Sequence, residues 1–501
     1  MRSKPRSGCP HSLQQPQSGN APVSIGTLVR VALISIAAFA LTACGADAPK
    51  QVASAGSLHS LPGITPPHLT VTHAASGVAP GFVFVAEKGG KHKPSGPVIA
   101  DNQGRIVWYH EVPHGLEATD FRTQTYRGKP VLTWWQGTIS KAGVGRGGYV
   151  VYDDTYQELK RLNAGNGLDG DLHEFALTPR GTAFIIAYHE VPADLRSVGG
   201  PKNGFVYDSV VQELDVATGD VKFEWHSLDH VPLKESLQAN REPAKNATKQ
   251  RPLDYFHVNS VGDAPGGNIL ISARNTSALY LLARDGHVIW RLGGTRSDFG
   301  PPAEVKFRFQ HDARLHADGT LSLFDNGAIP KLEPFTRPLV LKIDETERVA
   351  AIQKTFVYPQ KISAPYEGNL QLLSGGAAFV GWGGVRKVTE FSPGGQVRFE
   401  LKLPYGDTYR GYRLPWTGRP GGRPAVTVVG DRVYASWNGK TGVAFWEVLS
   451  GPDAGHLSKI AGHDWAGLET AIQLETPPPA VAVRALDRRG RQLGVSETVT
   501  S

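Results

Sequence analysis

The chain has 501 residues, including 58 Gly and 36 Pro but only 2 Cys, and a formal net charge of +7. Four of those positive charges (Arg2, Lys4, Arg6 and Arg30) lie among residues 1–43, which contain no acid. The remainder is therefore too close to neutral to predict nucleic-acid binding, and the near absence of helical periodicity excludes a helical protein.

The N-terminus has the pattern of an export signal. Residues 31–43, VALISIAAFALTA, form a 13-residue apolar run behind Arg30, which is shorter than the roughly 20 residues of a membrane-spanning helix. The run ends in Leu-Thr-Ala-Cys at Cys44 and resembles a bacterial lipobox. We expect residues 1–43 to be a lipoprotein signal peptide, and Cys44 to carry a fatty acid such as palmitate that anchors the protein outside a bacterial cell membrane. An ordinary signal peptide that happens to contain Cys44 is the alternative.

Residues 44–65 are small and polar, as expected of a tether. A repeated unit follows, in which an apolar strand precedes a hairpin with an Asx, Thr or Gly turn. The six strand segments are residues 81–87, 129–137, 181–190, 267–276, 319–327 and 376–384. Repeats of this kind, with about four strands each, are typical of a β-propeller. We predict an all-β protein whose residues 66–418 form a six-bladed β-propeller.

Three histidines occupy the same place in three successive units. His173, His257 and His311 each open a short apolar segment that leads through a Gly-containing turn into the next strand, and the spacing from His173 to Gly181 equals that from His311 to Gly319. Equivalent positions in successive blades lie on one ring around the channel. The register therefore predicts that the three imidazoles converge at one mouth of the channel.

Two further segments stand outside the repeat. Residues 228–255 have little apolar periodicity and end two residues before His257, so they form either a lid over the histidine face or a surface excursion. Residues 424–501 contain short alternating strands that predict a small β-sandwich, similar at its end to a fibronectin type III module.

Several separated motifs resemble the bacterial and fungal arylsulfotransferase family, and in particular its less characterised second branch. They are DLHEFALTPRGTA, DYFHVNSV, LYLLARDGHVIWRLGG, FQHDARLHADGTLSLFDNG and YRGYRLPWTG. The resemblance implies a six-bladed propeller that transfers a sulfuryl group from an aryl sulfate to a phenol, without the nucleotide sulfate donor and without a cofactor. In the studied branch a histidine is sulfated, and two other histidines and an arginine assist.

His257 in DYFHVNS and His311 in FQHDA match family histidines, whereas residues 317–455 contain no histidine at the place of the sulfated one. The nucleophile would then be His257, His311 or His173. The candidate catalytic residues are His257, His311, His173 and Arg274. The candidate substrate-binding residues are Asn259, Arg314, Arg337, Trp134 and Trp382.

The chemistry needs these residue types, because an imidazole attacks sulfur or moves a proton at neutral pH, and a cation stabilises the charge on the sulfuryl oxygens. Three alternatives stay open. The histidines could bond to turns as structural residues, they could hold a metal such as zinc, or the propeller could be a non-catalytic lipoprotein that binds a small ligand or a partner in the cell envelope. We favour the enzyme, with no metal.

Overall fold

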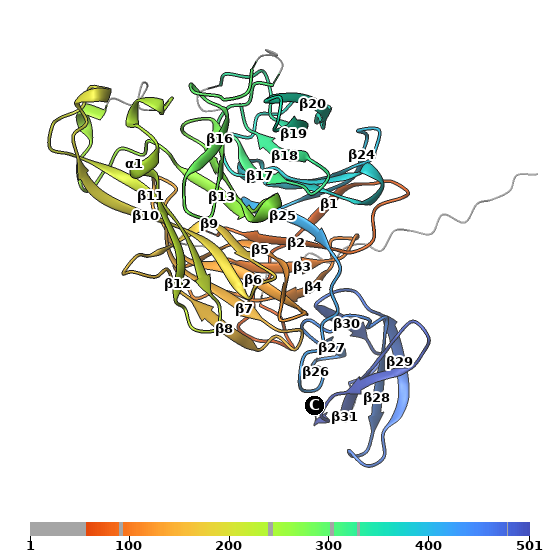
Figure 1. The fold of residues 1–501 in the computed structure, drawn as a ribbon. Helices are drawn as coiled ribbons and strands as arrows, with labels where there is room; N and C mark the ends of the chain where they lie inside the picture. The colour runs from red at the N-terminus through yellow and green to blue at the C-terminus, as the bar shows by residue number, and fades with distance from the viewer. Residues whose placement is uncertain are drawn as a thin grey trace, which may run out of the picture. The chain divides into compact units, whose positions relative to one another are not determined.

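The computed structural model describes residues 57–89, 94–238, 244–300, 305–327, 331–477 and 479–500, all of which belong to the compact unit Ala53–Ser501. The predicted signal peptide, the lipidation site Cys44 and most of the tether lie outside the described residues. Nearly all the regular structure is β-strand (Figure 1). The short helices are α1 (Ser227–His230), η2 (Arg196–Val198), η3 (Leu233–Glu235), η4 (Ala244–Asn246), η5 (Pro265–Gly267), η6 (Ser374–Gly376) and η7 (Gly383–Val385).

Two antiparallel sheets join distant parts of the chain. One has the order β25 (Thr408–Leu414), β2 (Phe82–Glu87), β3 (Gly96–Ala100) and β4 (Ile106–Tyr109). The other has the order β1 (Thr70–Ala74), β24 (Val397–Lys402), β23 (Lys387–Phe391), β22 (Ala378–Gly381) and β21 (Asn369–Leu372). Phe82 pairs with Leu414, and Thr70 pairs with Lys402. The two ends of the repeated region are therefore held together by backbone hydrogen bonds.

The middle of the chain forms consecutive four-stranded meanders. The first two comprise β5 (Glu117–Tyr126), β6 (Lys129–Ile139), β7 (Gly145–Tyr152) and β8 (Glu158–Leu162), then β9 (Gly170–Leu177), β10 (Thr182–Ala193), β11 (Gly204–Asp215) and β12 (Val221–His226). The next two comprise β13 (Val258–Asp263), β14 (Ile269–Ala273), β15 (Ala278–Leu282) and β16 (Val288–Gly293), then β17 (His311–Leu315), β18 (Thr320–Asp325), β19 (Arg337–Asp344) and β20 (Val349–Thr355). The pairing Gly147–Gly170 joins the first two into one larger sheet.

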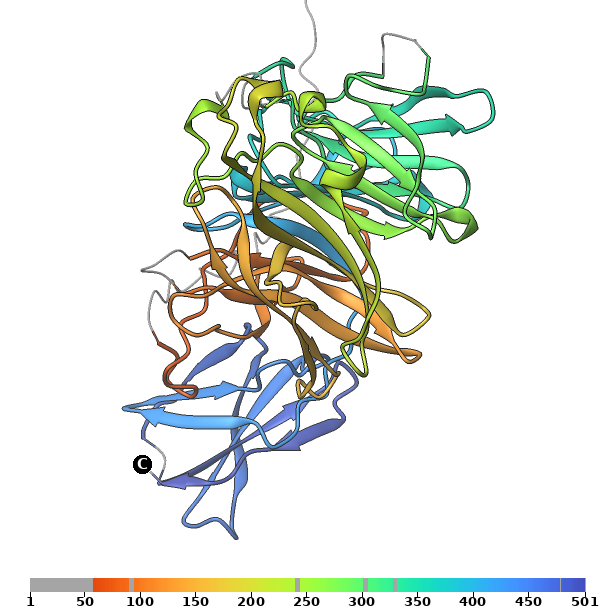
Figure 2. The same ribbon diagram turned by 60° about the vertical axis from the view of Figure 1, so that its left-hand side comes forward.

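One strand of each group contacts its counterpart in the next group. β5 contacts β9, β9 contacts β13, β13 contacts β17, β17 contacts β21, β21 contacts β25, and β25 contacts β5. Residues at the same register of these strands are thus neighbours in space, although they lie far apart in the sequence. Figure 2 shows the same strands from a second direction.

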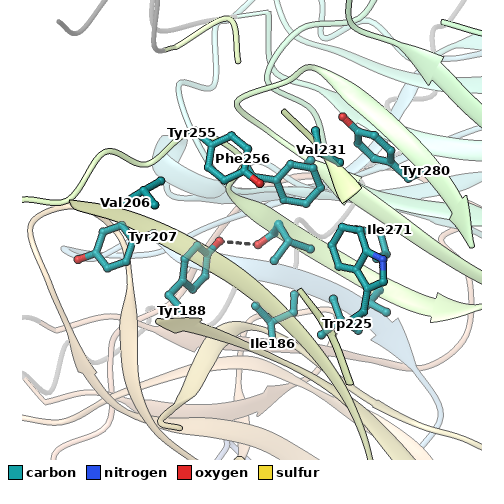
Figure 3. Packing of buried hydrophobic residues seen from close by; sticks show 14 of the residues in the cluster. Ile186, Tyr188, Val206, Tyr207, Trp225, Val231, Tyr255, Phe256, Ile271 and Tyr280 are labelled. Carbon is teal, nitrogen blue, oxygen red and sulfur yellow. Dashed lines mark hydrogen bonds between the residues drawn. The ribbon is translucent and has the colours of Figure 1, made fainter. Parts of the chain in front are cut away.

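Apolar side chains fill the spaces between neighbouring sheets. Between the sheet of β9 to β12 and that of β13 to β16, Tyr188, Trp225 and Phe256 pack in one buried cluster (Figure 3). The hydroxyl of Tyr188 donates a hydrogen bond of 2.6 Å to the carbonyl of Val258. Burying a side chain of this size stabilises the fold by about 2–3 kcal/mol. Through the Tyr188 hydrogen bond, the backbone next to His257 is attached to this well-packed core.

Residues beyond β25 form two further sheets. The smaller has the order β26 (Ala425–Val429), β27 (Arg432–Ser436) and β30 (Glu469–Gln473), and the larger has β29 (Ser458–Asp464), β28 (Phe445–Gly451), β31 (Ala480–Leu486) and β32 (Gln492–Val495), with β33 (Val499–Thr500) on β31. Val433 and Ile472 of the smaller sheet share one buried core with Trp446 and Val483 of the larger. Among the described residues, no helix is long and apolar enough to cross a membrane.

Candidate active site

A cavity of about 1250 Å³ in the described structure is lined by His173, His257, His311 and Arg274. His173 lies in β9, His257 directly precedes β13, and His311 opens β17. The rings of His173 and His257 are 4.9 Å apart between centroids and nearly perpendicular, at 84°. The structure thus brings together the four residues that the sequence nominates for catalysis.

The insertion at residues 228–255 lies at this cavity. Gln238, Ala247 and Leu253 belong to the cavity lining. Leu253 forms a parallel bridge with Val206 of β11, and its carbonyl accepts a 3.0 Å hydrogen bond from the Tyr207 N–H. The last part of the insertion is therefore held against β11 by backbone bonds and supplies one wall of the cavity.

Each histidine is held through its Nδ1 atom by an oxygen acceptor. Nδ1 of His173 contacts the Asp171 carboxylate, and Nδ1 of His257 lies 2.5 Å from Oδ2 of Asp254. A carboxylate only accepts, so Nδ1 carries the hydrogen and the Nε2 lone pair of a neutral ring is left over. Among the described residues, Nε2 of His173 and of His257 has no hydrogen-bond partner.

His311 is held differently, by the neutral amide of Asn326. Its Nδ1 donates to Oδ1 of Asn326 at 2.7 Å, while the Asn326 amide nitrogen donates to the carbonyls of Ala364 and Glu367. Those two bonds fix the amide orientation and with it the tautomer of His311. Its Nε2 in turn accepts the backbone N–H of Glu367 at 3.3 Å, so this lone pair is already engaged.

Burial lowers the pKa of two of the imidazoles. The pKa of His173 falls below its ordinary value because desolvation outweighs the attraction of Asp171. The pKa of His311 falls well below its ordinary value through desolvation and then through the positive charge of Arg274. Both rings are therefore neutral at pH 7, as a nucleophile or a hydrogen-bond acceptor requires.

Arg274 brings a positive charge to the cavity without a matching carboxylate. Its backbone N–H donates to the His257 carbonyl at 2.9 Å, and its guanidinium donates to the Asn275 side chain and lies 4.9 Å from the Phe309 ring centroid. None of the described carboxylates forms an ion pair with it. Burial accordingly lowers the pKa of Arg274. A buried guanidinium without a carboxylate partner favours the binding of an anionic ligand.

The backbone at His257 adopts a left-handed conformation, with φ = 56°. The pairing of β13 with β14 shifts register between Val258 and Ser260. Such a conformation costs an ordinary residue on the order of 1 kcal/mol and occurs preferentially at functional sites. At this bulge the His257 side chain takes its place in the cavity rather than in the sheet.

Tyr409 of β25 contacts the histidines, and its ring also lies 4.9 Å from the guanidinium of Arg410, which belongs to a buried ionic network. The Tyr409 ring is 5.4 Å from that of His173 and 6.5 Å from that of His311, between centroids. The network comprises Asp120, Arg122, Glu174, Asp312, Arg314 and Arg410. Asp120, which shares the histidine register in the sequence, pairs with Arg410 at 2.9 Å. Within the described residues, no group of three His, Cys, Asp or Glu side chains could hold a metal ion.

The predicted substrate-binding residues do not line the cavity. Arg314 pairs with Glu174 at 2.6 Å within the ionic network, and Arg337 pairs with Asp325 at 2.7 Å. The amide of Asn259 is buried and donates to the Gln310 carbonyl at 2.7 Å. Each of these side chains therefore has an internal partner and lies outside the cavity lining.

The two predicted aromatic walls are core residues. Trp134 is fully buried in an aromatic cluster, 4.7 Å from the Tyr152 ring, and Trp382 is fully buried and donates its indole N–H to Thr389 at 3.0 Å. Both side chains point into the spaces between sheets. The two tryptophans therefore lie on faces of their strands that point away from the cavity.

Sequence reasoning missed the residues that hold the histidines. Asp171 and Asp254 lie two and three residues before His173 and His257, so the D-x-H and D-x-x-H spacing was an available signal. Asn326 belongs to the FDNG motif but was not assigned to His311. Lys88, Glu367 and Asp407, which line the cavity, come from three separate loops and left no local signal.

The chain was compared with known proteins. Curated proteins include no match. Two solved structures that resemble it are a Bacteroides caccae protein of unknown function (12% identity, 66% of this chain and 98% of that one, TM-score 0.40) and virginiamycin B lyase from Staphylococcus aureus (10% identity, 74% and 94%, TM-score 0.29).

The model described as arylsulfotransferase (ASST) matches residues 122–403, which is more than half of the chain. The matched segment contains His173, His257, His311 and Arg274. The chain therefore belongs to the arylsulfotransferase (ASST) family.

Proposed function

We propose that this protein is an aryl sulfotransferase, which moves a sulfuryl group from an aryl sulfate ester to a phenolic acceptor. The observation that carries the proposal is the meeting of three imidazoles with an arginine that has no carboxylate partner among the described residues, all lining one cavity. The family match supports the same reaction. An aryl sulfate has a negative group for Arg274 and an electrophilic sulfur for an imidazole.

His257 is the nucleophile in this proposal. Its Nε2 attacks sulfur, the bond between sulfur and the aryl oxygen breaks, and a phenolate leaves. The acceptor oxygen then attacks the sulfuryl group, the nitrogen–sulfur bond breaks, and the imidazole is restored. Asp254 orients the ring, Arg274 stabilises the sulfuryl oxygens, and His173 is the neighbouring imidazole. His311 is less suited to attack because its Nε2 accepts a backbone N–H.

The proposal extends to the architecture and the location. We infer a six-bladed β-propeller over residues 66–418, supported by the strand contacts that run from β5 round to β25 and back, and a fibronectin type III-like sandwich over residues 424–501. We also infer a lipid anchor on Cys44 at the outer face of a bacterial membrane. Metabolic labelling with palmitate, lost in Cys44→Ala, tests the anchor.

A second candidate is a non-catalytic lipoprotein that binds a small ligand or a partner in the cell envelope. Residues 317–455 contain no histidine, and this absence is the observation that favours it. Incubating the purified protein with 4-nitrophenyl sulfate and phenol separates the two. Release of 4-nitrophenol together with phenyl sulfate supports the enzyme, and binding without turnover supports the second candidate.

A further inference from the structure

A charged cluster on the cavity wall has no role in the chemistry described so far. Lys88 follows β2, Glu367 precedes β21, and Asp407 precedes β25, and all three residues line the cavity. Nζ of Lys88 contacts Oε1 of Glu367 and lies 2.9 Å from Oδ1 of Asp407. Two carboxylates thus share one ammonium group, and the cluster has an excess of acceptor oxygens.

Glu367 is the incompletely bonded member of this cluster. Its side chain is only 12% exposed, and its Oε2 is buried without a hydrogen-bond partner among the described residues. A buried carboxylate oxygen in that state is costly unless a donor reaches it. Since Glu367 lines the cavity, a ligand bound there would bring a donor, such as a phenolic hydroxyl, close to this side chain.

The backbone fixes Glu367 beside the histidines. Its N–H donates to Nε2 of His311 at 3.3 Å, its carbonyl accepts from Asn326 at 2.9 Å, and its φ is 61°. The position of this carboxyl is therefore tied to the same framework that positions His311. A proton-transfer group held in this way keeps its geometry during a reaction.

We propose that Glu367 carries the phenolic proton in the transfer, an inference that rests on the proposed function. In the first half-reaction protonated Glu367 gives its proton to the phenolate oxygen as the sulfur–oxygen bond breaks. In the second half-reaction the carboxylate takes the proton of the acceptor hydroxyl as that oxygen attacks sulfur and the nitrogen–sulfur bond breaks. Glu367 ends protonated as it began, and the Lys88 ammonium stabilises the carboxylate between the two steps.

The charges around Glu367 suit both roles. Burial raises the pKa of Glu367 to about 7, with Lys88 opposing and Asp407 and Glu117 adding to the rise. Among the described residues, His311 and Tyr366 are further titratable groups close to it. A group with this pKa supplies both an acid and a base at neutral pH. The histidines are less suited to this task, since His173 and His311 have lowered pKa values and His257 is the proposed nucleophile.

The test measures the two half-reactions separately in the Glu367→Gln variant. The donor is 4-nitrophenyl sulfate, whose leaving group needs no proton. The acceptors are phenol and pentafluorophenol, the second already ionised at the assay pH. The variant should keep the burst of 4-nitrophenol that reports sulfation of the enzyme. It should lose at least about a hundredfold in transfer to phenol and little in transfer to pentafluorophenol.

Equal losses for both acceptors, or no loss for either, would overturn the assignment. If the wild-type protein shows neither burst nor transfer, the proposed function fails instead. Asp407→Asn provides a second measurement in case Glu367→Gln does not fold. Removing this negative charge lowers the pKa of Glu367, so the acid limb of the pH profile for phenol should move to lower pH. An unmoved limb would also overturn the proposal.

Discussion

Two neighbouring polar clusters, called here the lower cluster (the ionic network around Arg410) and the upper cluster (the histidines and Arg274), differ in how their charged groups are paired. In the lower cluster three arginines face three carboxylates, and each charge is paired. In the upper one Arg274 has no carboxylate partner, and Nε2 of His173 and His257 has no donor, among the described residues. A buried charge is stable only when paired, so the lower cluster serves the fold and the upper one is open to a ligand.

The two clusters also differ in how far apart in the sequence their interacting residues lie. Arg410 lies in β25, and its partners Asp120, Glu174 and Asp312 lie in β5, β9 and β17. It therefore ties the end of the repeated region to three strands of two other sheets. The histidines take their partners from nearby residues, Asp171 and Asp254, or from the adjacent strand end, Asn326. The lower cluster therefore connects strands that are distant in the sequence, whereas the histidines of the upper cluster are positioned by residues close to them in the sequence.

The largest expected effect breaks the lower cluster. Arg410→Met leaves three buried carboxylates short of a cation, so the free energy of unfolding should fall by about 3–5 kcal/mol, measured by urea denaturation. The matched control is Arg146→Met, whose guanidinium is 58% exposed and pairs with Glu190 at the surface, and which should cost less than about 1 kcal/mol. Equal losses of unfolding free energy in the two variants would show that the buried network stabilises the fold no more than a surface ion pair does.

The next effect concerns the upper cluster and falls on activity rather than stability. His257→Ala and His311→Ala should each reduce turnover of 4-nitrophenyl sulfate at least about a hundredfold. The midpoint of thermal unfolding should change much less, because both rings line the cavity rather than filling the spaces between the sheets. Large destabilisation with retained turnover would mark these histidines as structural.

A smaller effect sharpens the role of the supporting carboxylates. Asp254→Asn keeps an oxygen acceptor for Nδ1 of His257 but removes the charge, which is the arrangement that His311 already has with Asn326. Turnover should fall only about tenfold, because the tautomer is retained while the ring loses basicity. Asp254→Ala, which loses the acceptor, should be the more damaging control. If both substitutions are harmless, Asp254 does not position the ring.

The smallest effect is a contrast in pH dependence. Burial raises the pKa of Glu174, but Arg314, Arg410 and Arg122 outweigh it and hold that pKa below the ordinary 4.5. Its stabilising contribution is therefore present above pH 4.5 and is lost as the pH falls through the lower folded value. The pKa of Glu367 is raised from 4.5 to about 7, so its ionisation destabilises the fold as the pH rises from 4.5 to 7.

Glu367→Gln removes that destabilisation. It should therefore increase the free energy of unfolding, relative to the wild type, above pH 7 but not at pH 4.5. Urea denaturation at the two pH values measures this difference. Glu174→Gln should have the opposite effect: its free energy of unfolding should be lower than that of the wild type at pH 7, and the difference should become smaller in acid. The same sign for both variants would contradict the contrast between the two clusters.

The sequence by itself determined the all-β class and the order of the hairpins, because alternating apolar residues and turn residues act locally. It also placed His173, His257 and His311 in one register, and the structure shows them lining one cavity. Asp171 and Asp254 were within reach of sequence reasoning too, since they lie two and three residues from the histidines they hold.

The tertiary structure decided which equivalent positions face the cavity. Trp134 and Trp382 lie near equivalent strand ends, yet both rings pack between sheets. Arg314 and Arg337 are plausible anion ligands until their partners Glu174 and Asp325 are seen. Lys88, Glu367 and Asp407 meet only because three loops converge. The physical reason is the same in each case: a side chain's availability depends on which charges and surfaces far along the chain reach it first, and no local pattern records that.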